Sequence, residues 1–203
     1  MKFVYLMSAA AILMAGSAQA AESTVSNNQN NSANIKARIG ATIQGVNDSV
    51  SLTSAAIANT MTLEGGQADY LGNFQVFNGD SVAELNGTIT NVSGDVNATA
   101  AAIANSATIS VDYARTIQNT QMAGVDPTAI LGATISGVSE NVEATAAAIS
   151  NTATINGDFG YLGSYQVNGA AVNAIAGLNV SNVQGTVSVT AAAIGNTLTV
   201  KGF

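Results

Sequence analysis

Hydrophobic and polar positions recur along the chain in four segments that align without gaps. Each segment opens with Thr and a run of small residues, continues through Ile and Asn two positions later, and closes with Thr alternating with apolar residues. The segments cover 53–63, 99–109, 145–155 and 190–200, so their spacing is 46, 46 and 45 residues. A fixed period of this length is typical of repeat architectures. The sequence therefore predicts four structural repeats.

A second, longer period groups these repeats in pairs. The segment 70–76 recurs as 161–167, and three spacer residues, Val25, Asn27 and Gln29, lie 92 residues before Ile117, Asn119 and Gln121. The chain after residue 20 is thus a duplicated half of about 92 residues, itself made of two units. The predicted units are 21–65, 66–111, 112–157 and 158–203.

Alternation within the motif predicts a β-strand. In the first unit one face carries Ala55, Ile57, Asn59, Met61 and Leu63, and the other face carries only small residues. Such two-residue periodicity suits a strand. The alternative is a short helix, for example over 92–105, because Ala is the best helix former. The Thr, Ile, Val and Asn residues that follow the alanines disfavour that helix.

Uniform register predicts that the units stack with like residues in contact. The predicted stacking ladders are Ile57, Ile103, Ile149 and Ile194, and Asn59, Asn105, Asn151 and Asn196. Apolar columns exclude water, and Asn ladders satisfy side-chain amides along the axis. A unit of 46 residues is long for one triangular rung and suits two rungs of about 23, which would give eight rungs and a column on the order of 38 Å. The alternative is one large rung per unit. The predicted fold class is all-β, a repeat β-solenoid.

The first twenty residues are typical of a secretory signal peptide. Lys2 supplies a positive charge, 3–14 is a short apolar core, and Ala18-Gln19-Ala20 is a small-x-small cleavage pattern. The alternative is a membrane anchor, but the apolar run is shorter than the roughly 20 residues that a span needs. No later segment is apolar enough to cross a membrane. We therefore predict an exported protein without a transmembrane span.

Composition argues against catalysis and against nucleic-acid binding. The chain has 5 Lys and Arg, 12 Asp and Glu, no His and no Cys. The usual general base and any thiol nucleophile or thiolate metal site are therefore missing, and the few scattered cations do not suit nucleic acid. We predict no enzyme, no cofactor and no metal site. The acids in Asn78-Gly79-Asp80 and Asn156-Gly157-Asp158, and the pair Glu140 and Glu143, are interpreted as turn residues because calcium loops need several alternating carboxylates.

Low charge also has a structural interpretation. Only 8% of the residues are charged, against about 25% in typical domains. A charge at a repeated position would lie about 4.8 Å from its own copy in the next rung, where like charges repel. Small, neutral and amide-bearing residues tolerate such neighbours, so the composition favours self-stacking.

The ends of the predicted stack lack caps. The fourth motif runs to Val200, three residues before the last residue of the sequence, and 21–34 is polar without a helical pattern. A bare terminal rung exposes unpaired backbone groups, so we expect head-to-tail pairing with another copy or docking on an outer-membrane or cell-surface protein. The alternative is that Lys201 and the terminal carboxylate block the edge.

Four aromatic residues form a candidate binding surface. Tyr70 and Phe74, and likewise Tyr161 and Tyr165, lie four residues apart with a glycine between them, so each pair shares one strand face. Exposed rings in this arrangement could stack on the sugar rings of a glycan. The alternative is that they fill the core of a rung or shield an edge.

Taken together, the signal peptide, the Gly-, Asn-, Ser-, Thr- and Ala-rich repeats and the absence of Cys resemble exported fibre subunits of the curlin-like kind and holdfast-type adhesive proteins of bacterial surfaces. The resemblance implies passage through the periplasm and across an outer membrane of a Gram-negative-type cell, self-assembly, and a role in adhesion or biofilm matrix. The predicted function is a structural subunit that self-assembles or docks on the cell surface. The alternatives are a monomeric adhesin that binds glycans through its aromatic strips, and a solenoid glycan hydrolase, for which the acids are sparse.

Overall fold

The computed structural model describes residues 6–10 and 24–202, and it folds them into strands and turns with no helix. Among these residues there is accordingly no helical segment able to cross a membrane. The ten strands are β1 (Leu6–Ala10), β2 (Thr24–Asn31), β3 (Ile35–Val46), β4 (Val50–Phe77), β5 (Ser81–Val92), β6 (Val96–Ala123), β7 (Pro127–Val138), β8 (Val142–Asn168), β9 (Asn173–Val183) and β10 (Val187–Lys201).

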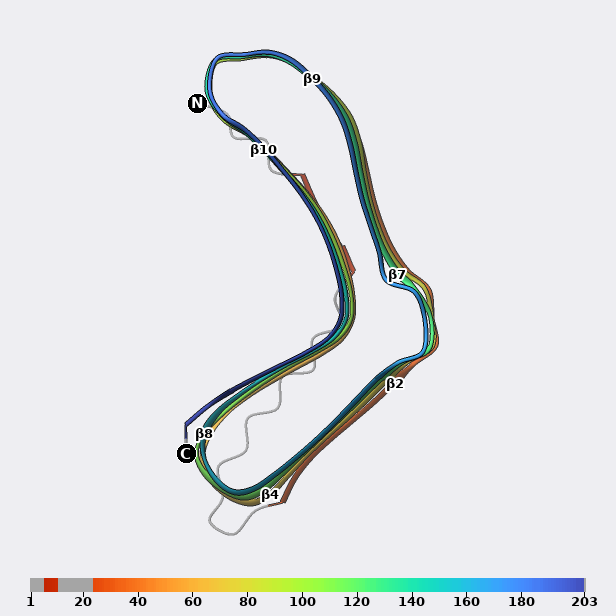
Figure 1. The fold of residues 1–203 in the computed structure, drawn as a ribbon, viewed down its shortest axis with the longest axis vertical. Coiled ribbons are helices and arrows are strands. Elements are labelled where there is room, and N and C mark those ends of the chain that lie inside the picture. Colours follow the sequence, from red (N-terminus) through yellow and green to blue (C-terminus); the bar gives the residue numbers. More distant parts are fainter. Residues whose placement is uncertain (1–5, 11–23, 203) are drawn as a thin grey trace.

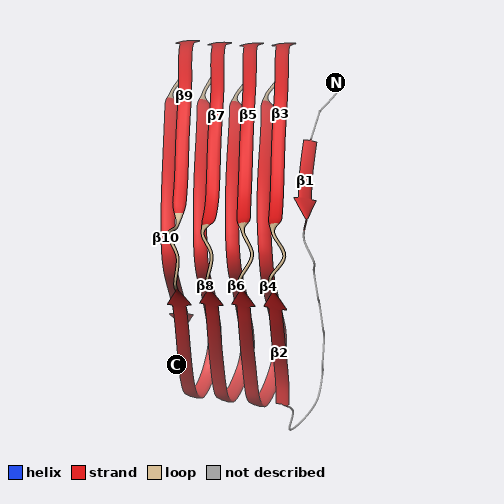
Figure 2. Ribbon diagram, turned by 90° about the vertical axis from the view of Figure 1, so that its right-hand side faces the viewer, coloured by secondary structure: helices blue, strands red, loops and turns tan. Residues whose placement is uncertain are grey.

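The strands form two parallel sheets. The sheets extend along the axis of the stack and pack against each other through apolar side chains. The larger sheet has the order β1-β4-β6-β8-β10, with β2 paired to a later part of β4, and the smaller has the order β3-β5-β7-β9. Successive rungs lie next to one another like the turns of a flattened coil (Figure 2). The prediction of an all-β solenoid is confirmed.

One repeat makes one rung. Ile57 pairs with Ile103, Ile103 with Ile149 and Ile149 with Ile194, so each step between neighbouring strands equals the sequence period. The expectation of two rungs per unit and eight rungs in all is therefore wrong. The described stack has four full rungs, which corresponds to a length of about 19 Å at a strand spacing of about 4.8 Å. A rung this long is possible because its outline is bent rather than triangular (Figure 1).

The long strands bend in the middle of the repeated motif. In β4, Ser54, Ala56 and Ala58 point inward, and then Asn59, Met61 and Leu63 do so, because Ala58 and Asn59 are buried in succession. The inward parity therefore switches at this point. The prediction that Ile57 and Asn59 share one face is wrong: Ile57 lies on the outer side, while Asn59 is buried and bonded to the returning limb of the same strand.

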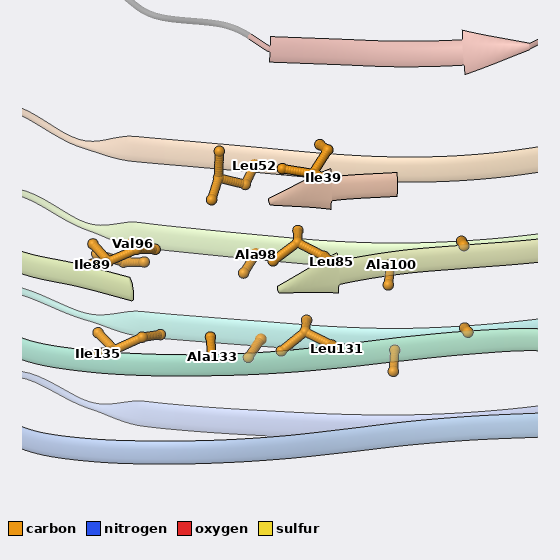
Figure 3. Packing of buried hydrophobic residues seen from close by; sticks show 14 of the residues in the cluster. Ile39, Leu52, Leu85, Ile89, Val96, Ala98, Ala100, Leu131, Ala133 and Ile135 are labelled. Carbon is orange, nitrogen blue, oxygen red and sulfur yellow. The ribbon is translucent and has the colours of Figure 1, made fainter. Parts of the chain in front are cut away.

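Two large apolar cores fill the rung, together with a small third cluster of Ala58, Phe77, Ala104 and Ala123. The first fills the space between the small sheet and the first limb of the long strands, and it includes Leu52, Leu85, Leu131 and Ile135 (Figure 3). The second fills the lobe where the long strands fold back on themselves, and it includes Leu71, Ile109, Ile117 and Ile155. Burial of this apolar surface supplies the main driving force for folding.

Residues with positive φ mark a corner in every rung. Gly45, Asn91, Gly137 and Asn182 have φ between 54° and 68° and occupy equivalent positions just before the ends of β3, β5, β7 and β9. Gly and Asn are the residues that adopt this left-handed conformation most readily. Their alternation follows the 92-residue period of the sequence.

The fourth repeat is one residue shorter at a defined corner. Between β6 and β8 the register shifts after Ser110, and Gly157 beside this shift has φ of 128°. A Cβ at Gly157 would overlap the carbonyl oxygen of Val111 on the preceding rung. The missing residue is therefore accommodated by a glycine at a close backbone contact.

The predicted unit boundaries after residues 65, 111 and 157 fall inside β4, β6 and β8, at the corners where these strands turn back. Of the predicted signal peptide, residues 1–5 and 11–20 lie outside the described residues. Strand β1 (Leu6–Ala10) falls within that segment and pairs with β4.

Candidate functional site

The predicted Asn ladder is a continuous hydrogen-bonded column. Asn59 donates through Nδ2 to Oδ1 of Asn105 at 2.8 Å, Asn105 donates to Asn151 at 2.7 Å, and Asn151 donates to Asn196 at 2.7 Å. Each of the first three also donates to a backbone carbonyl of the returning limb, which belongs to Val76, Met122 or Val167. The column therefore ties the two limbs of each long strand together while it links the rungs.

A Gln ladder faces the Asn ladder across the same interior. Gln166 donates through Nε2 to Oε1 of Gln121 at 2.7 Å, Gln121 donates to Gln75 at 2.9 Å, and Gln75 donates to Gln29 at 2.8 Å. Each also donates to a carbonyl on the opposite limb, such as Thr60 for Gln29. Donation thus runs toward the N-terminal end, opposite to the direction in the Asn ladder.

A third ladder lies on the returning limb. Asn27 donates to Oδ1 of Asn73 at 2.7 Å, Asn73 donates to Asn119 at 2.7 Å, and Asn119 donates to the Ser164 hydroxyl at 3.2 Å. In the described part of the chain no buried side-chain nitrogen or oxygen lacks a hydrogen-bond partner. Satisfied networks of this kind stabilise a polar interior, which would otherwise be costly.

The Gln ladder and the third ladder are not among the ladders predicted above. The 92-residue period aligns Gln29 with Gln121 and, separately, Gln75 with Gln166, so it does not show that all four form one column. The signal that finds it is the shorter period, because Gln29, Gln75, Gln121 and Gln166 follow one another at 46, 46 and 45 residues. The same spacing connects Asn27, Asn73, Asn119 and Ser164.

The predicted Ile ladder is in register but lies on the outer surface. Ile57, Ile103 and Ile149 are half-buried, and Ile194 in the last rung is exposed. The column therefore lies on the outer side of the long strands and does not belong to the buried apolar clusters.

The last rung exposes residues whose equivalents are buried. Leu52, Ala98 and Ala144 are buried, whereas Val189 at the same position of β10 is 49% exposed. In the same way Met61, Ala107 and Ala153 are buried, and Leu198 is 43% exposed. The C-terminal face of the stack therefore exposes the ends of both large cores, and the outer edge of β10 pairs with no described strand.

The four predicted aromatic residues lie on the outer face of the returning limb. Phe74, Tyr161 and Tyr165 are exposed, the tyrosines by 58% and 61%, and Tyr70 is half-buried. The Tyr70 and Tyr161 rings lie against Gly72 and Gly163, where a Cβ would be 2.9 Å and 3.4 Å from the ring. The glycines thus make room for the rings.

A polar rung separates the two aromatic pairs. Thr116, Gln118 and Thr120 of β6 lie in register between Tyr70, Gly72 and Phe74 on one side and Tyr161, Gly163 and Tyr165 on the other. Gln118 accepts a hydrogen bond from the Tyr70 hydroxyl at 2.9 Å. Two shallow depressions are lined by Gln118 and Thr120, one together with Tyr70 and Phe74 and the other together with Tyr165.

Charged residues form no reactive cluster in the described part of the chain. Asp80 and Glu140 lie in turns, Glu143 and Asp158 are exposed on β8, and no three acidic residues gather where they could hold a metal ion. The ion pair between Arg38 and Glu84, at 2.7 Å, links β3 to β5 on the surface.

Comparison with protein families decides what class of protein this stack belongs to. The model of the family described as holdfast attachment protein D matches residues 66–203, which is more than half of the chain. The chain belongs to the holdfast attachment protein D family. Searches of curated proteins and of solved structures gave no match.

Membership in the holdfast attachment protein D family identifies a bacterial attachment protein of the cell surface or the extracellular space. The matched residues contain most of the three ladders, the depression beside Tyr165 and the exposed C-terminal face. The holdfast part of the predicted resemblance is thereby confirmed, and the curlin-like part stays a prediction.

Proposed function

We propose that the protein is an exported structural subunit of bacterial attachment, which self-assembles or docks on the cell surface through the open ends of its stack. The main support for this proposal is the C-terminal face. There Val189 and Leu198 expose apolar surface, whereas the inner rungs bury the residues at the same positions. Exposed apolar surface beside an unpaired strand edge is a typical protein interface. The ladders explain how such a subunit stays rigid without disulfides.

The proposal includes export from a Gram-negative-type cell through the periplasm, with removal of the predicted signal peptide. It assigns no catalytic residue, cofactor or metal to the chain. The sequence supports this because His and Cys are absent from all 203 residues.

The test is the assembly state of the chain 21–203. We expect filaments or large particles by negative-stain microscopy, and light scattering that rises with protein concentration, or else binding to outer-membrane fractions. The control replaces Val189 and Leu198 by Lys, which both exposed positions tolerate in the single chain. We expect this variant to lose assembly or binding, because burying a charge against an apolar partner is costly. A chain that stays monomeric at high concentration and binds no surface fraction refutes the proposal.

The aromatic face supports a second candidate function, which is glycan binding. Exposed Tyr165 lines one depression together with Gln118 and Thr120, and the exposed Tyr161 ring lies against Gly163 of the same depression. Rings for stacking therefore lie near groups that form hydrogen bonds with sugar hydroxyls. The test titrates a panel of soluble hexose and N-acetylhexosamine oligosaccharides. Replacing both tyrosines by Ala should abolish binding, whereas replacing Ser181 on the exposed β9 edge by Ala should not. Unchanged affinity in the tyrosine variant excludes this candidate.

A further inference from the structure

The three ladders end with hydrogen-bonding groups of defined polarity. At the N-terminal end, the Oδ1 atoms of Asn59 and Asn27 accept no hydrogen bond from any described residue, and Gln29 Nε2 has one bond, to the Thr60 carbonyl at 2.9 Å. Its counterparts on inner rungs make two. This end therefore presents two acceptors and one donor.

The C-terminal end presents the opposite set. Asn196 Nδ2 makes one long bond, at 3.3 Å to the Gln166 carbonyl, and Gln166 Oε1 accepts no hydrogen bond from the described residues. The Ser164 hydroxyl accepts from Asn119 and still has its own proton to donate. This end therefore presents two donors and one acceptor, in the columns where the other end has two acceptors and one donor.

We propose that the C-terminal face binds the N-terminal face of a second copy of this chain, in the register that continues the internal repeat. The inference rests on the proposed function and names its partner. In each ladder the two ends lie three repeats apart, so a single rigid placement puts Asn59 of the second copy on Asn196 and Gln29 on Gln166. The same placement puts Asn27 on Ser164, and every donor then meets an acceptor. Two N-terminal faces placed together would instead set the acceptors of Asn59 against each other.

Charge and apolar surface fit the same placement. Glu64, Ser110, Asn156 and Lys201 form one column, so continued register places Glu64 of the second copy next to Lys201. It also places Leu52 against Val189 and Met61 against Leu198, which restores the burial that these columns have inside the stack. Opposite charges on neighbouring strands attract, so the ion pair favours this orientation.

Strand β1 occupies part of this interface. It pairs in parallel with β4 from Leu6 opposite Leu52 to Ala10 opposite Ala56, and it lies at the N-terminal end of the stack (Figure 2). In the proposed joint the same edge of β4 pairs with 189–193 of a second copy. The two strands therefore exclude each other, and removal of the predicted signal peptide frees the edge. Strand β1 thus delays the joint between two copies until the signal peptide is removed during export.

Cysteine cross-linking tests the register, because the chain has no Cys of its own. Thr62 and Thr199 are exposed and lie in one column. Neighbouring parallel strands lie about 4.8 Å apart, within the range of Cα distances that a disulfide needs. We expect the variants T62C and T199C of 21–203 to form a disulfide-linked dimer when mixed, and neither to do so alone. The intrachain pair T62C and T108C is the positive control, and S51C mixed with T199C is the out-of-register control.

The outcomes separate this inference from the proposed function. The head-to-tail joint is overturned, while the structural role stands, if the chain forms large assemblies with any of three cross-linking results. These are disulfides between two T62C chains, disulfides between two T199C chains, or no disulfides. A chain that neither assembles nor binds a surface fraction overturns both. Efficient cross-linking of S51C with T199C overturns the register.

Two further measurements test the polarity and the role of β1. Asn196→Asp replaces a donor by a carboxylate on the exposed end of the ladder, so we expect cross-linking of T199C chains that carry this change to T62C chains to weaken about tenfold or more at neutral pH. Asn196→Gln, which keeps the donor, is the matched control. The uncleaved chain 1–203 should cross-link about tenfold less than 21–203. Equal yields from the two chains overturn the proposed role of β1.

Discussion

Replacing Asn105 by Ala tests how much the Asn ladder contributes to the free energy of unfolding. Asn105 is fully buried, donates to the Met122 carbonyl at 2.9 Å and to Asn151 at 2.7 Å, and accepts from Asn59 at 2.8 Å. The substitution removes three hydrogen bonds and leaves the carboxamide oxygen of Asn151 without a donor. Each buried polar group that loses its partner costs about 1–3 kcal/mol. The variant should therefore lose about 3–5 kcal/mol.

The matched control is Asn196→Ala, which removes the same residue type from the exposed end of the same column. Asn196 accepts one bond from Asn151, at 2.7 Å, and its other bond is long. We expect a loss of about 1 kcal/mol there. The assay is equilibrium urea unfolding of 21–203, at concentrations where the chain is monomeric, followed by far-UV circular dichroism. Equal losses of unfolding free energy in the two variants would refute this reasoning. They would show that a buried Asn of the ladder contributes no more to stability than the exposed Asn at its end.

Two smaller predictions concern a corner and a surface ion pair. Gly157→Ala should lower the free energy of unfolding by at least about 2 kcal/mol, because of its positive φ and the close Val111 carbonyl. Gly65→Ala, at the corresponding corner of β4 with open space around it, should raise the free energy of unfolding by up to about 1 kcal/mol. Thermal melts of both variants check this, and similar effects would contradict it. Arg38→Ala should change stability by less than about 1 kcal/mol, since Arg38 is 75% exposed in its pair with Glu84; a larger loss in urea unfolding at low and high salt would contradict it.

The stack and its register follow from the sequence because the period alone determines which residues meet. Ile57 and Asn59 recur at the 46-residue period of the sequence, and each copy pairs with the next, so their columns could be predicted from the sequence alone. The size of the rung could not. Two rungs per unit would need a triangular outline, whereas the 28-residue strands β4 and β6 turn back on themselves and pair with the next strand on both sides of the corner.

The bend at Asn59 is the feature that sequence alternation hides. Two consecutive buried residues, Ala58 and Asn59, shift the inward parity, and the reason lies in a hydrogen bond to Val76 on a limb 17 residues away. Local periodicity carries no information about that limb. Tyr161 and Tyr165 lie on one outer face because an even number of positions separates them within β8, which is the part of the aromatic surface that alternation can predict.

The direction of the hydrogen bonds has a mechanical consequence for an attachment protein. Backbone bonds between parallel strands and all three amide ladders point along the axis of the stack. A pull along that axis loads the bonds between two rungs together, so they share the force and must yield almost at once. A sideways force on one corner loads the hydrogen bonds one after another, so they break in sequence at a lower force. The same rung interface is thus strong under axial tension and weak under peeling.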